Sequence, residues 1–410
     1  MSCYDSACHI VRTLNQHGFI AYFAGGWVRD FLMKHPSDDI DIATNASPED
    51  IQKIFTKTIP IGIQFGIVIV VYKDHHFEIA TFRKDHGYED GRRPIGIERS
   101  TPEEDAKRRD FTINGMFYDP ITDKLLDFVG GKEDLGKKII RAIGNPHERF
   151  LEDRLRMIRA VRYACRFHFV IEEATKQAIY NHANALFPAV AIERVWQEFY
   201  KMRRFGSFKL FMLQLYELKL LQTIFPELAT LSMQEILSRL QPLDHFPKEA
   251  PLIGKILELF PGSTLEKQLQ VCEKFKLSNQ DKEFVKYYYS VHSALQSSDA
   301  HLIEPHVWAH LYANSSFSLC SAMSLARLPK EAAESIIAFH ARAQEKLSWA
   351  VERIRNKTPL VTSQHLLKEG ISPGIIMGAL LKEAEKISIN HALQDPSAVL
   401  AKLKTSSLWP

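Results

Sequence analysis

The stretch that decides the fold is DDIDIAT, residues 38–44. Polar and apolar residues alternate in it, so we expect a β-strand with Asp39 and Asp41 on one face and Ile40 and Ile42 on the other. The isoleucine face can pack on a hydrophobic core. The opposite face carries two neighbouring carboxylates, which repel each other unless a cation lies between them.

The residues around this strand predict an α/β segment. Strands are expected in HGFIAYFAGG (17–26), in DDIDIAT, and in GIVIVVY (66–72) and FEIATFR (77–83), which read as a hairpin. One short helix follows the two glycines, and a second begins in SPEDIQKIF, where Ser47 is a good N-cap and Pro48 a good first residue. The polar residues 84–107, rich in Gly and Pro, predict a long loop. LLDFVGG (125–131) predicts a further strand.

From about Asn145 onward, helical patterns dominate. LEDRLRMIRAVRYACRF (151–167) predicts one amphipathic helix with apolar residues on one side and four arginines on the other. IERVWQEFYKMRRFG (192–206) predicts another helix with a basic end. The fold class we expect is therefore α+β, with a mixed or antiparallel sheet in the N-terminal part and helices in the remainder.

The composition limits the class of protein. The chain has 410 residues, 45% hydrophobic and 25% charged, which is ordinary for a globular protein, and its formal net charge of +3 does not by itself predict a nucleic-acid partner. The five scattered cysteines predict reduced thiols and neither a disulfide framework nor a zinc site. The N-terminus lacks the pattern of a signal peptide and no apolar run is long enough to cross a membrane, so we expect a cytoplasmic protein.

The paired aspartates suit Mg²⁺, which prefers oxygen ligands and bridges to substrate phosphates. A third carboxylate often completes such a site, and Glu78 in FEIATFR is the candidate. The alternative is a strand face whose aspartates are merely solvated.

The glycines before the strand indicate a phosphate site. Gly25 and Gly26 allow the backbone to approach a ligand closely, the following helix N-terminus can hold phosphate, and Arg29 adds a forked donor. The alternative for Arg29 is a salt bridge to Asp30 or Asp38.

Together these features carry a resemblance. GGWVRDFLMKHPSDDIDIAT (25–44) resembles the head motif of the class II tRNA nucleotidyltransferase and bacterial poly(A) polymerase family, within the polymerase β-like nucleotidyltransferases. Further segments are similar to motifs of that family and follow in the same order: RRDFTING (108–115), EDRLR (152–156), IERVWQE (192–198) and LLKEGISPGIIMGALL (366–381). The chain departs from the family pattern at Gly115, where the family usually has Ala.

The resemblance implies roles for individual residues. It makes Asp39 and Asp41 the metal ligands, and Glu78, chosen from the strand pattern, is the predicted third catalytic carboxylate. It makes Asp153 and Arg156 the amino-acid template that reads the edge of the incoming base. The alternative for this last pair is a surface salt bridge between residues three apart on one helix. The full set of residues predicted to bind nucleotide is Gly25, Gly26, Arg29, Arg109, Asp110, Asn114, Asp153, Arg156, Arg159 and Arg162.

A basic stripe next to this site is predicted to contact RNA phosphates. Its members are Arg166, Lys201, Arg203 and Arg204. The alternative is a solvated helix face. Residues 84–107 correspond to the flexible loop that the family associates with switching from C to A addition, with Arg92 and Arg93 as mobile charges there. A disordered surface excursion is the alternative.

The resemblance also implies the domains and the activity. The expected domains are a nucleotidyltransferase head (1–140), a helical neck that recognises the base (141–206), a helical body (207–290) and a helical tail that binds tRNA (291–410). The expected activity is the addition of CCA to the tRNA 3′ end from CTP and ATP with Mg²⁺, with no membrane and no obligate protein partner. Alternatives are a poly(A) polymerase, an enzyme that adds only CC or only A, and a non-catalytic RNA-binding protein.

Overall fold

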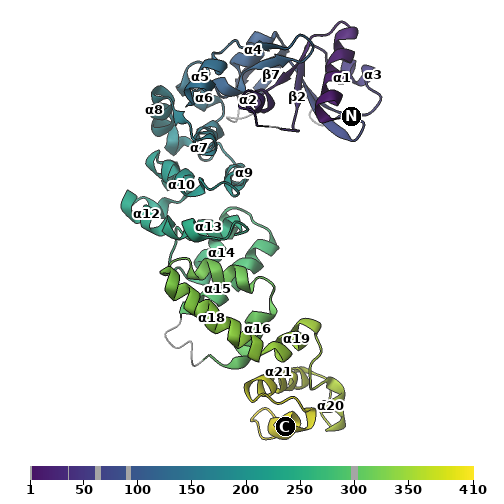
Figure 1. Ribbon diagram of the computed structural model, residues 1–410, viewed down its shortest axis with the longest axis vertical. Coiled ribbons are helices and arrows are strands. Elements are labelled where there is room, and N and C mark those ends of the chain that lie inside the picture. Colours follow the sequence, from purple (N-terminus) through teal and green to yellow (C-terminus); the bar gives the residue numbers. More distant parts are fainter. Residues whose placement is uncertain (1, 36, 61–65, 89–93, 297–302) are drawn as a thin grey trace. The chain divides into compact units, whose positions relative to one another are not determined.

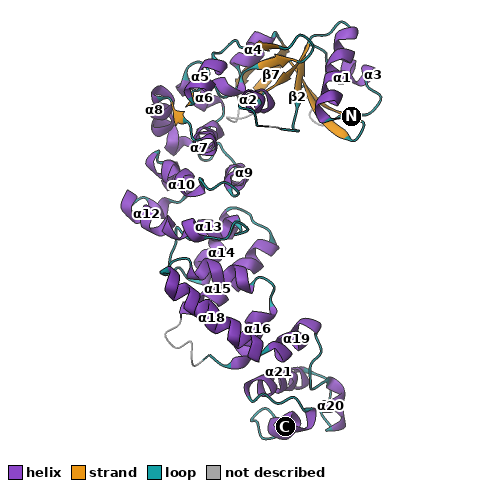
Figure 2. Ribbon diagram, viewed as in Figure 1, coloured by secondary structure: helices purple, strands orange, loops and turns teal. Residues whose placement is uncertain are grey.

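A computed structural model describes residues 2–35, 37–60, 66–88, 94–296 and 303–410. The chain forms two compact units, Met1–Ile236 and Leu237–Pro410 (Figure 1). The described strands all lie in the first unit, and the second unit is helical (Figure 2). The expected α+β class is confirmed. The finer division into head, neck, body and tail stays a prediction.

The described residues of the first unit form a seven-stranded mixed sheet with the order β3-β4-β5-β2-β1-β8-β9. The strands are β1 (Ala21–Ala24), β2 (Asp41–Thr44), β3 (Thr58–Ile59), β4 (Ile67–Tyr72), β5 (His75–Thr81), β8 (Phe117–Asp119) and β9 (Lys124–Leu126). Only the β2–β5 pair is parallel among them. The predicted hairpin of β4 and β5 is confirmed. β2 begins at Asp41, so Asp39 and Ile40 precede the strand instead of lying in it as expected.

The apolar face of this sheet packs under three helices, α1 (Cys3–Gln16), α2 (Gly26–Leu32) and α3 (Pro48–Ile54). Ile40 and Ile42 are 4% and 1% exposed, as expected for the apolar side of the alternating stretch. The predicted start of α3 is confirmed, because the Ser47 hydroxyl accepts the N–H of Asp50 and Pro48 is the first helical residue. The core thus fixes which way the aspartates point.

The loop predicted over 84–107 is wrong for most of its length. β6 (Arg83–Tyr88) and β7 (Pro94–Arg99) form an antiparallel two-stranded sheet, and α4 (Pro102–Lys107) follows, capped by the Thr101 hydroxyl. The residues of these two strands do not alternate between polar and apolar, so the sequence carries no strand signal there. Arg92 and Arg93 lie outside the described residues.

The single helix predicted over 151–167 is two helices. α6 (Pro146–Glu152) ends before Asp153, whose backbone is extended at φ −147° and ψ 103°, and α7 (Leu155–Phe167) begins after Arg154. The Asp153 carboxylate accepts the N–H of Leu155 at 3.1 Å. Aspartate favours such local bonds over helix continuation, which explains the break.

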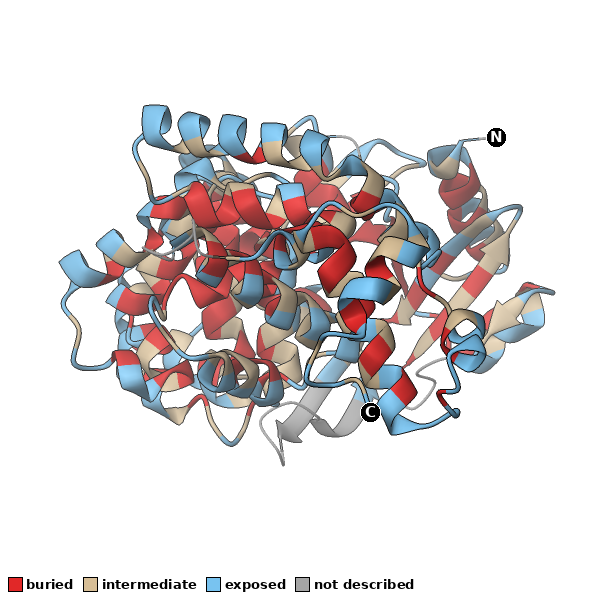
Figure 3. Cartoon of the chain, turned by 90° about the horizontal axis from the view of Figure 1, so that it is seen from below, coloured by how far each residue is buried: buried red, intermediate tan, exposed pale blue. Residues whose placement is uncertain are grey.

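Short elements complete the first unit, and helices make up the second. In the first these are η2 (Thr112–Asn114), α5 (Gly131–Lys137), β10 (Ile139–Ile140), β11 (Val170–Ile171), α8 (Glu173–His182), η3 (Ala183–Ala185), α9 (Ile192–Met202), α10 (Phe208–Glu217), α11 (Leu220–Ile224) and η4 (Pro226–Leu228). From the boundary onward they are α12 (Met233–Leu240), η5 (Gln241–His245), α13 (Leu252–Leu257), α14 (Leu265–Lys274), α15 (Asn279–Gln296), α16 (Pro305–Ala313), α17 (Phe317–Leu325), α18 (Lys330–Lys346), α19 (Ser348–Asn356), α20 (Ser363–Lys368), α21 (Ile375–Asn390) and α22 (Pro396–Leu403). Many helices bury one face and expose the other (Figure 3).

All five cysteines are free, and four of them are buried. No described helix is long and apolar enough to span a bilayer.

Candidate active site

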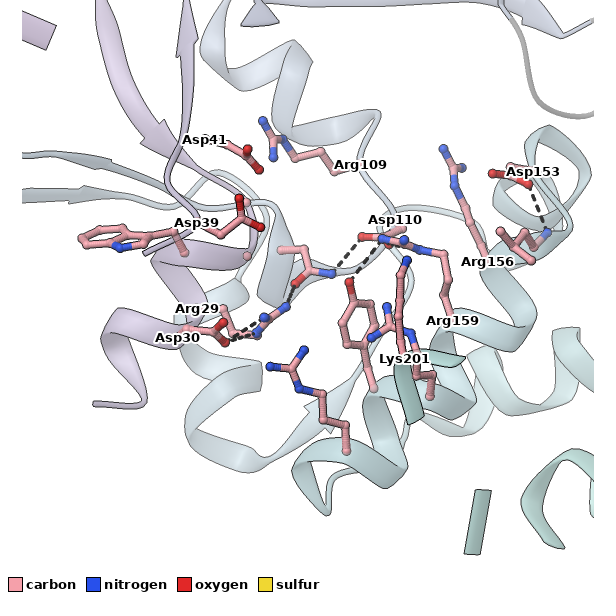
Figure 4. A pocket seen from close by; sticks show the side chains of 18 of the residues that line it. Arg29, Asp30, Asp39, Asp41, Arg109, Asp110, Asp153, Arg156, Arg159 and Lys201 are labelled. Carbon is pink, nitrogen blue, oxygen red and sulfur yellow. Dashed lines mark hydrogen bonds and ion pairs between the residues drawn. The ribbon is translucent and has the colours of Figure 1, made fainter. Parts of the chain in front are cut away.

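The predicted residues converge on one cavity of about 610 Å³ in the first unit (Figure 4). The predicted residues that line it are Gly25, Gly26, Arg29, Asp39, Asp41, Arg109, Asp110, Asn114, Asp153, Arg156, Arg159, Arg162, Arg166 and Lys201. Glu78, Arg203 and Arg204 do not line it. Residues that the sequence did not single out but that line the cavity include Trp27, Ser37, Arg108, Tyr163 and Arg194.

The two aspartates border the cavity at the start of β2. Burial raises the pKa of Asp41 to about 7, with further contributions from the charges of Glu78 and Asp39, while Arg109 acts in the opposite direction. Burial and Asp39 likewise raise the pKa of Glu78. Ile42 pairs with Ile79 across the parallel strands, which sets Glu78 beside Asp41. The three carboxylates therefore form one electrostatic cluster.

The arrangement of the three carboxylates does not meet the geometry of a metal site with three protein ligands. Among the described residues, no group of three or more His, Cys, Asp and Glu side chains is arranged so that it could hold a metal ion. Glu78 therefore stays a prediction as a third ligand. His306 and His310, which have a metal-compatible spacing, instead pair with Glu304 and Glu385.

Gly25 is required by the close approach of three segments. Its φ is +68°, and a Cβ atom placed on it would lie 3.1 Å from Arg109 Nη1 and 3.7 Å from Asp41 Oδ2. A side chain here would be strained and would fill the space between the carboxylate and the guanidinium. The first glycine of the predicted pair thus keeps that corner of the cavity open.

Arg29 belongs to a buried hydrogen-bond chain (Figure 4). It is 3% exposed, its Nε donates to Asp30 at 2.8 Å, and its Nη1 donates to Asn114 Oδ1 at 2.6 Å. Asn114 Nδ2 in turn donates to Asp110 at 3.0 Å. The alternative of an Arg29–Asp30 salt bridge is therefore confirmed, and Arg29 also orients Asn114.

Asp110 ends this chain at the helical side of the cavity. Arg159 Nε donates to its carboxylate at 2.9 Å. Burial alone would raise the pKa of Asp110, but the Arg159 guanidinium and the Asn114 amide hold it well below its usual value. Asp110 is thus a fixed anion that joins the RRDFTING segment to α7.

Asp153 and Arg156 face the cavity without pairing with each other. Asp153 accepts two bonds from Arg194, at 2.8 and 3.2 Å, and Arg156 Nη1 donates to Glu152 at 2.5 Å. The alternative of a salt bridge between residues 153 and 156 is wrong, because the helix breaks between them. Arg194 lies in the IERVWQE motif. The sequence did not predict its ion pair with Asp153.

The predicted arginine face of α7 is largely neutralised. Arg162 and Glu198 are 3% and 2% exposed and form a buried ion pair, which Lys201 joins through Glu198 at 2.9 Å. Arg203 lies over the Tyr200 ring at 3.4 Å from its centroid. Binding of RNA by Lys201, Arg203 and Arg204 stays a prediction.

The Arg162–Glu198 pair gives a stability prediction. Arg162→Ala removes the buried ion-pair partner of the Glu198 carboxylate and leaves it with Lys201 and the more distant charge of Arg159, so we expect the free energy of unfolding to fall by about 3 kcal/mol. Urea unfolding followed by circular dichroism measures this. Lys137→Ala, which breaks an exposed pair with Glu133, is the control and should cost at most about 1 kcal/mol. A loss below 1 kcal/mol in Arg162→Ala would show that the pair is not needed for stability.

The family usually has Ala at the position of Gly115. In this chain, neighbouring atoms already occupy the place that a Cβ atom would take there. A Cβ there would lie 2.7 Å from Val129 Cγ2 and 3.0 Å from Ile143 Cδ1. Neighbouring apolar side chains therefore fill the space that an alanine methyl would take.

Comparison with known proteins agrees with this site. The family model described as "Poly A polymerase head domain" matches residues 21–141, and "Probable RNA and SrmB- binding site of polymerase A" matches residues 168–231. The CCA-adding enzyme of Lactobacillus delbrueckii subsp. bulgaricus is 31% identical over 401 residues, which is 97% of each chain. The chain belongs to the family of CCA-adding enzymes. The family resemblance read from the sequence is confirmed, and nucleotidyltransferases of this family generally use a divalent metal.

Other members of the CCA-adding family match over different lengths. The CCA-adding enzyme of Enterococcus faecalis is 46% identical over 201 residues, so the match spans 48% of this chain and about half (49%) of that relative. The solved CCA-adding enzyme of Bacillus stearothermophilus in complex with CTP aligns with a TM-score of 0.78 and 26% identity, over 99% of this chain and 98% of that one. The Thermotoga maritima CCA-adding enzyme complexed with tRNA shares the fold, with a TM-score of 0.65 and 21% identity over 97% and 94% of the two chains.

Proposed function

We propose that the chain adds CCA to the 3′ end of tRNA, using CTP and ATP without a nucleic-acid template and releasing pyrophosphate. One observation carries this proposal: a single cavity brings the carboxylates Asp39 and Asp41 together with the polar pair Asp153 and Arg156. Relatives solved with CTP, with ATP and with tRNA support it. The reaction belongs in the cytoplasm, where these substrates meet.

The donor set fits a divalent metal, and we propose Mg²⁺. Its ligands are the carboxylate oxygens of Asp39 and Asp41, the type that Mg²⁺ prefers. Burial and the neighbouring charges of Glu78 and Asp39 raise the pKa of Asp41 to about 7, and a bound cation offsets this cost of holding the carboxylate ionised. When bound, the metal lowers the pKa of the attacking hydroxyl and neutralises charge on the phosphates. Glu78 would support the site from β5.

Arg109 is placed to contact the triphosphate. Its Nε and Nη2 donate to Asp105 at 3.1 and 3.0 Å, which leaves Nη1 on the side of Gly25 and Asp41. The 3′ hydroxyl of the RNA attacks the α-phosphate, a new P–O bond forms, the α–β bridge breaks and pyrophosphate leaves. A guanidinium fixed at this corner orients the triphosphate for that displacement.

Asp153 and Arg156 suit the two bases of CCA. Cytosine and adenine each present an amino donor beside a ring-nitrogen acceptor on the Watson–Crick edge, whereas uracil and guanine present the reverse. Asp153 can accept from the amino group and Arg156 can donate to the ring nitrogen. A base with the reverse pattern sets a carbonyl oxygen against the Asp153 carboxylate and an N–H against the Arg156 guanidinium, and neither pair can form a hydrogen bond, which is a basis for rejection.

Incorporation with single nucleotides tests the proposal. With a tRNA that ends at the discriminator base, we expect two additions with CTP alone, none with ATP alone, and three with both. Long products with ATP alone would instead identify a poly(A) polymerase, which the name of the matched head-domain model makes the second candidate. Termination after CC, or addition of A only to tRNA ending in CC, would identify a specialised enzyme. No pyrophosphate release with any nucleotide would identify a non-catalytic RNA-binding protein.

A further inference from the structure

A second cavity, of about 580 Å³, borders the active-site cavity and shares Arg166 with it. Nitrogen-bearing side chains line it from three segments, namely His35 after α2, Lys132 and Lys138 at α5, and Arg166 and His168 at the end of α7. The rest of the described lining is apolar or glycine and contains neither aspartate nor glutamate. The cavity is therefore positively charged with no acidic group in its described walls.

Arg166 is the half-buried cation that connects the two cavities. Its guanidinium lies over the rings of Phe167 and Phe205, at 4.9 and 5.3 Å from their centroids. Burial lowers its pKa, and the positive charges of Arg29 and Arg162 lower it further. Asp30, the acid that acts in the opposite direction, is held by Arg29 at 2.7 Å. Among the described residues, no carboxylate thus lies at ion-pair distance from Arg166.

Two of the three lysines at α5 line the second cavity and one does not. Lys137, which does not line the cavity, is paired with Glu133 at 2.5 Å. Lys132 and Lys138 line the cavity, and within the described part of the chain neither has a carboxylate at ion-pair distance. Lys138 has a left-handed backbone, φ +59°, fixed by its N–H bonds to the last turn of α5. The end of α5 therefore holds Lys138 at the cavity, while Lys137 is paired with Glu133 away from it.

We propose that this second cavity is a phosphate subsite for the RNA strand whose 3′ end is extended. Three cations without an ion-pair partner among the described residues line this cavity and repel each other, and a backbone phosphate relieves that repulsion. Continuity through Arg166 favours the primer strand, because that strand must reach the active-site cavity. The free nucleotide has phosphates of the same chemistry, but Arg109 already offers a donor for them beside Asp41. This inference rests on the proposed function.

The double variant Lys132→Gln/Lys138→Gln tests the subsite with a minihelix RNA that has a single-stranded 3′ end. Glutamine keeps a polar side chain that is one atom shorter than lysine, and the two substitutions remove both charges. We expect the Kd and KM for the RNA to rise about tenfold, and the slope of log Kd against log salt to fall by about one. The KM for CTP and the kcat at saturating RNA should stay at the parent values. Lys137→Gln, on the same helix but away from the cavity, is the matched control and should leave all four quantities unchanged.

Each outcome decides between this inference and its alternatives. A parent Kd and salt slope in the double variant would overturn the subsite. A rise in the KM for CTP with unchanged RNA binding would also overturn it, and would assign the cavity to the nucleotide. Because RNA binding is measured by fluorescence anisotropy without catalysis, a chain that fails to incorporate CTP refutes the proposed function but still reports on the subsite.

Discussion

Asp41→Ala is expected to reduce CTP incorporation by roughly a thousandfold or more, equivalent to about 4 kcal/mol of transition-state stabilisation. The carboxylate of Asp41 is the more buried of the proposed metal ligands, and alanine offers no oxygen in its place. RNA binding should remain close to that of the parent, because the predicted RNA contacts lie on other residues. Primer extension with CTP measures the first expectation, and fluorescence anisotropy with tRNA measures the second.

The same variant should fold at least as well as the parent. Burial and the charges of Glu78 and Asp39 raise the pKa of Asp41, which means that its ionised form is disfavoured in the folded chain. Removing that carboxylate therefore removes a cost, and the unfolding temperature without metal should be unchanged or higher. Loss of activity would then not be a loss of folding.

Asp38→Ala is the matched control. Asp38 is the neighbouring exposed aspartate of DDIDIAT and does not line the cavity, so its variant should keep the parent rate. Full incorporation by Asp41→Ala would refute the assignment of the aspartates as the metal ligands.

The parts of the site that the sequence predicted depend on local patterns. The alternation of DDIDIAT places Ile40 and Ile42 in the core and so sends Asp39 and Asp41 to the cavity, and the positive φ of Gly25 agrees with the two-glycine signal. These features need only a few neighbouring residues. They were readable because burial of the apolar face fixes the direction of the polar one.

The parts that the sequence missed depend on distant partners or on main-chain bonds. Asp153 and Arg194 are 41 residues apart, and Arg162 and Glu198 are 36 apart. With 52 Lys and Arg and 49 Asp and Glu in the chain, nothing in the sequence selects one pair over another. The pairing of β6 with β7 was missed because these charged strands, which contain Gly and Pro, lack the alternating apolar pattern by which a strand is recognised.

The sequence also could not predict that β2 pairs with β5 in parallel. The hairpin of β4 and β5 was readable, but which edge of it meets β2 depends on the packing of the whole sheet. That pairing brings Glu78 next to Asp41, so the candidate third carboxylate was chosen correctly as a neighbour while its role as a ligand stays a prediction.

Arg156→Ala is expected to lower kcat/KM for CTP about a hundredfold and to weaken the preference for CTP over UTP by a similar factor. The Arg156 guanidinium is anchored by Glu152 and by the carbonyl oxygens of Arg149 and Arg108, so it is held in one orientation at the cavity wall. A donor that is fixed before the base arrives discriminates better than a mobile one. Steady-state kinetics with each of the four nucleotides measures both effects.

Arg154→Gln separates base reading from a general loss of positive charge. Arg154 precedes α7 next to the same motif but does not line the cavity, so its variant should keep both the rate and the base preference. If Arg156→Ala slowed all four nucleotides equally, the guanidinium would act on the triphosphate or on the orientation of the domain, and base selection would have to come from Asp153 and Arg194. A selective loss for CTP and ATP is the result that only hydrogen bonding to the base edge explains.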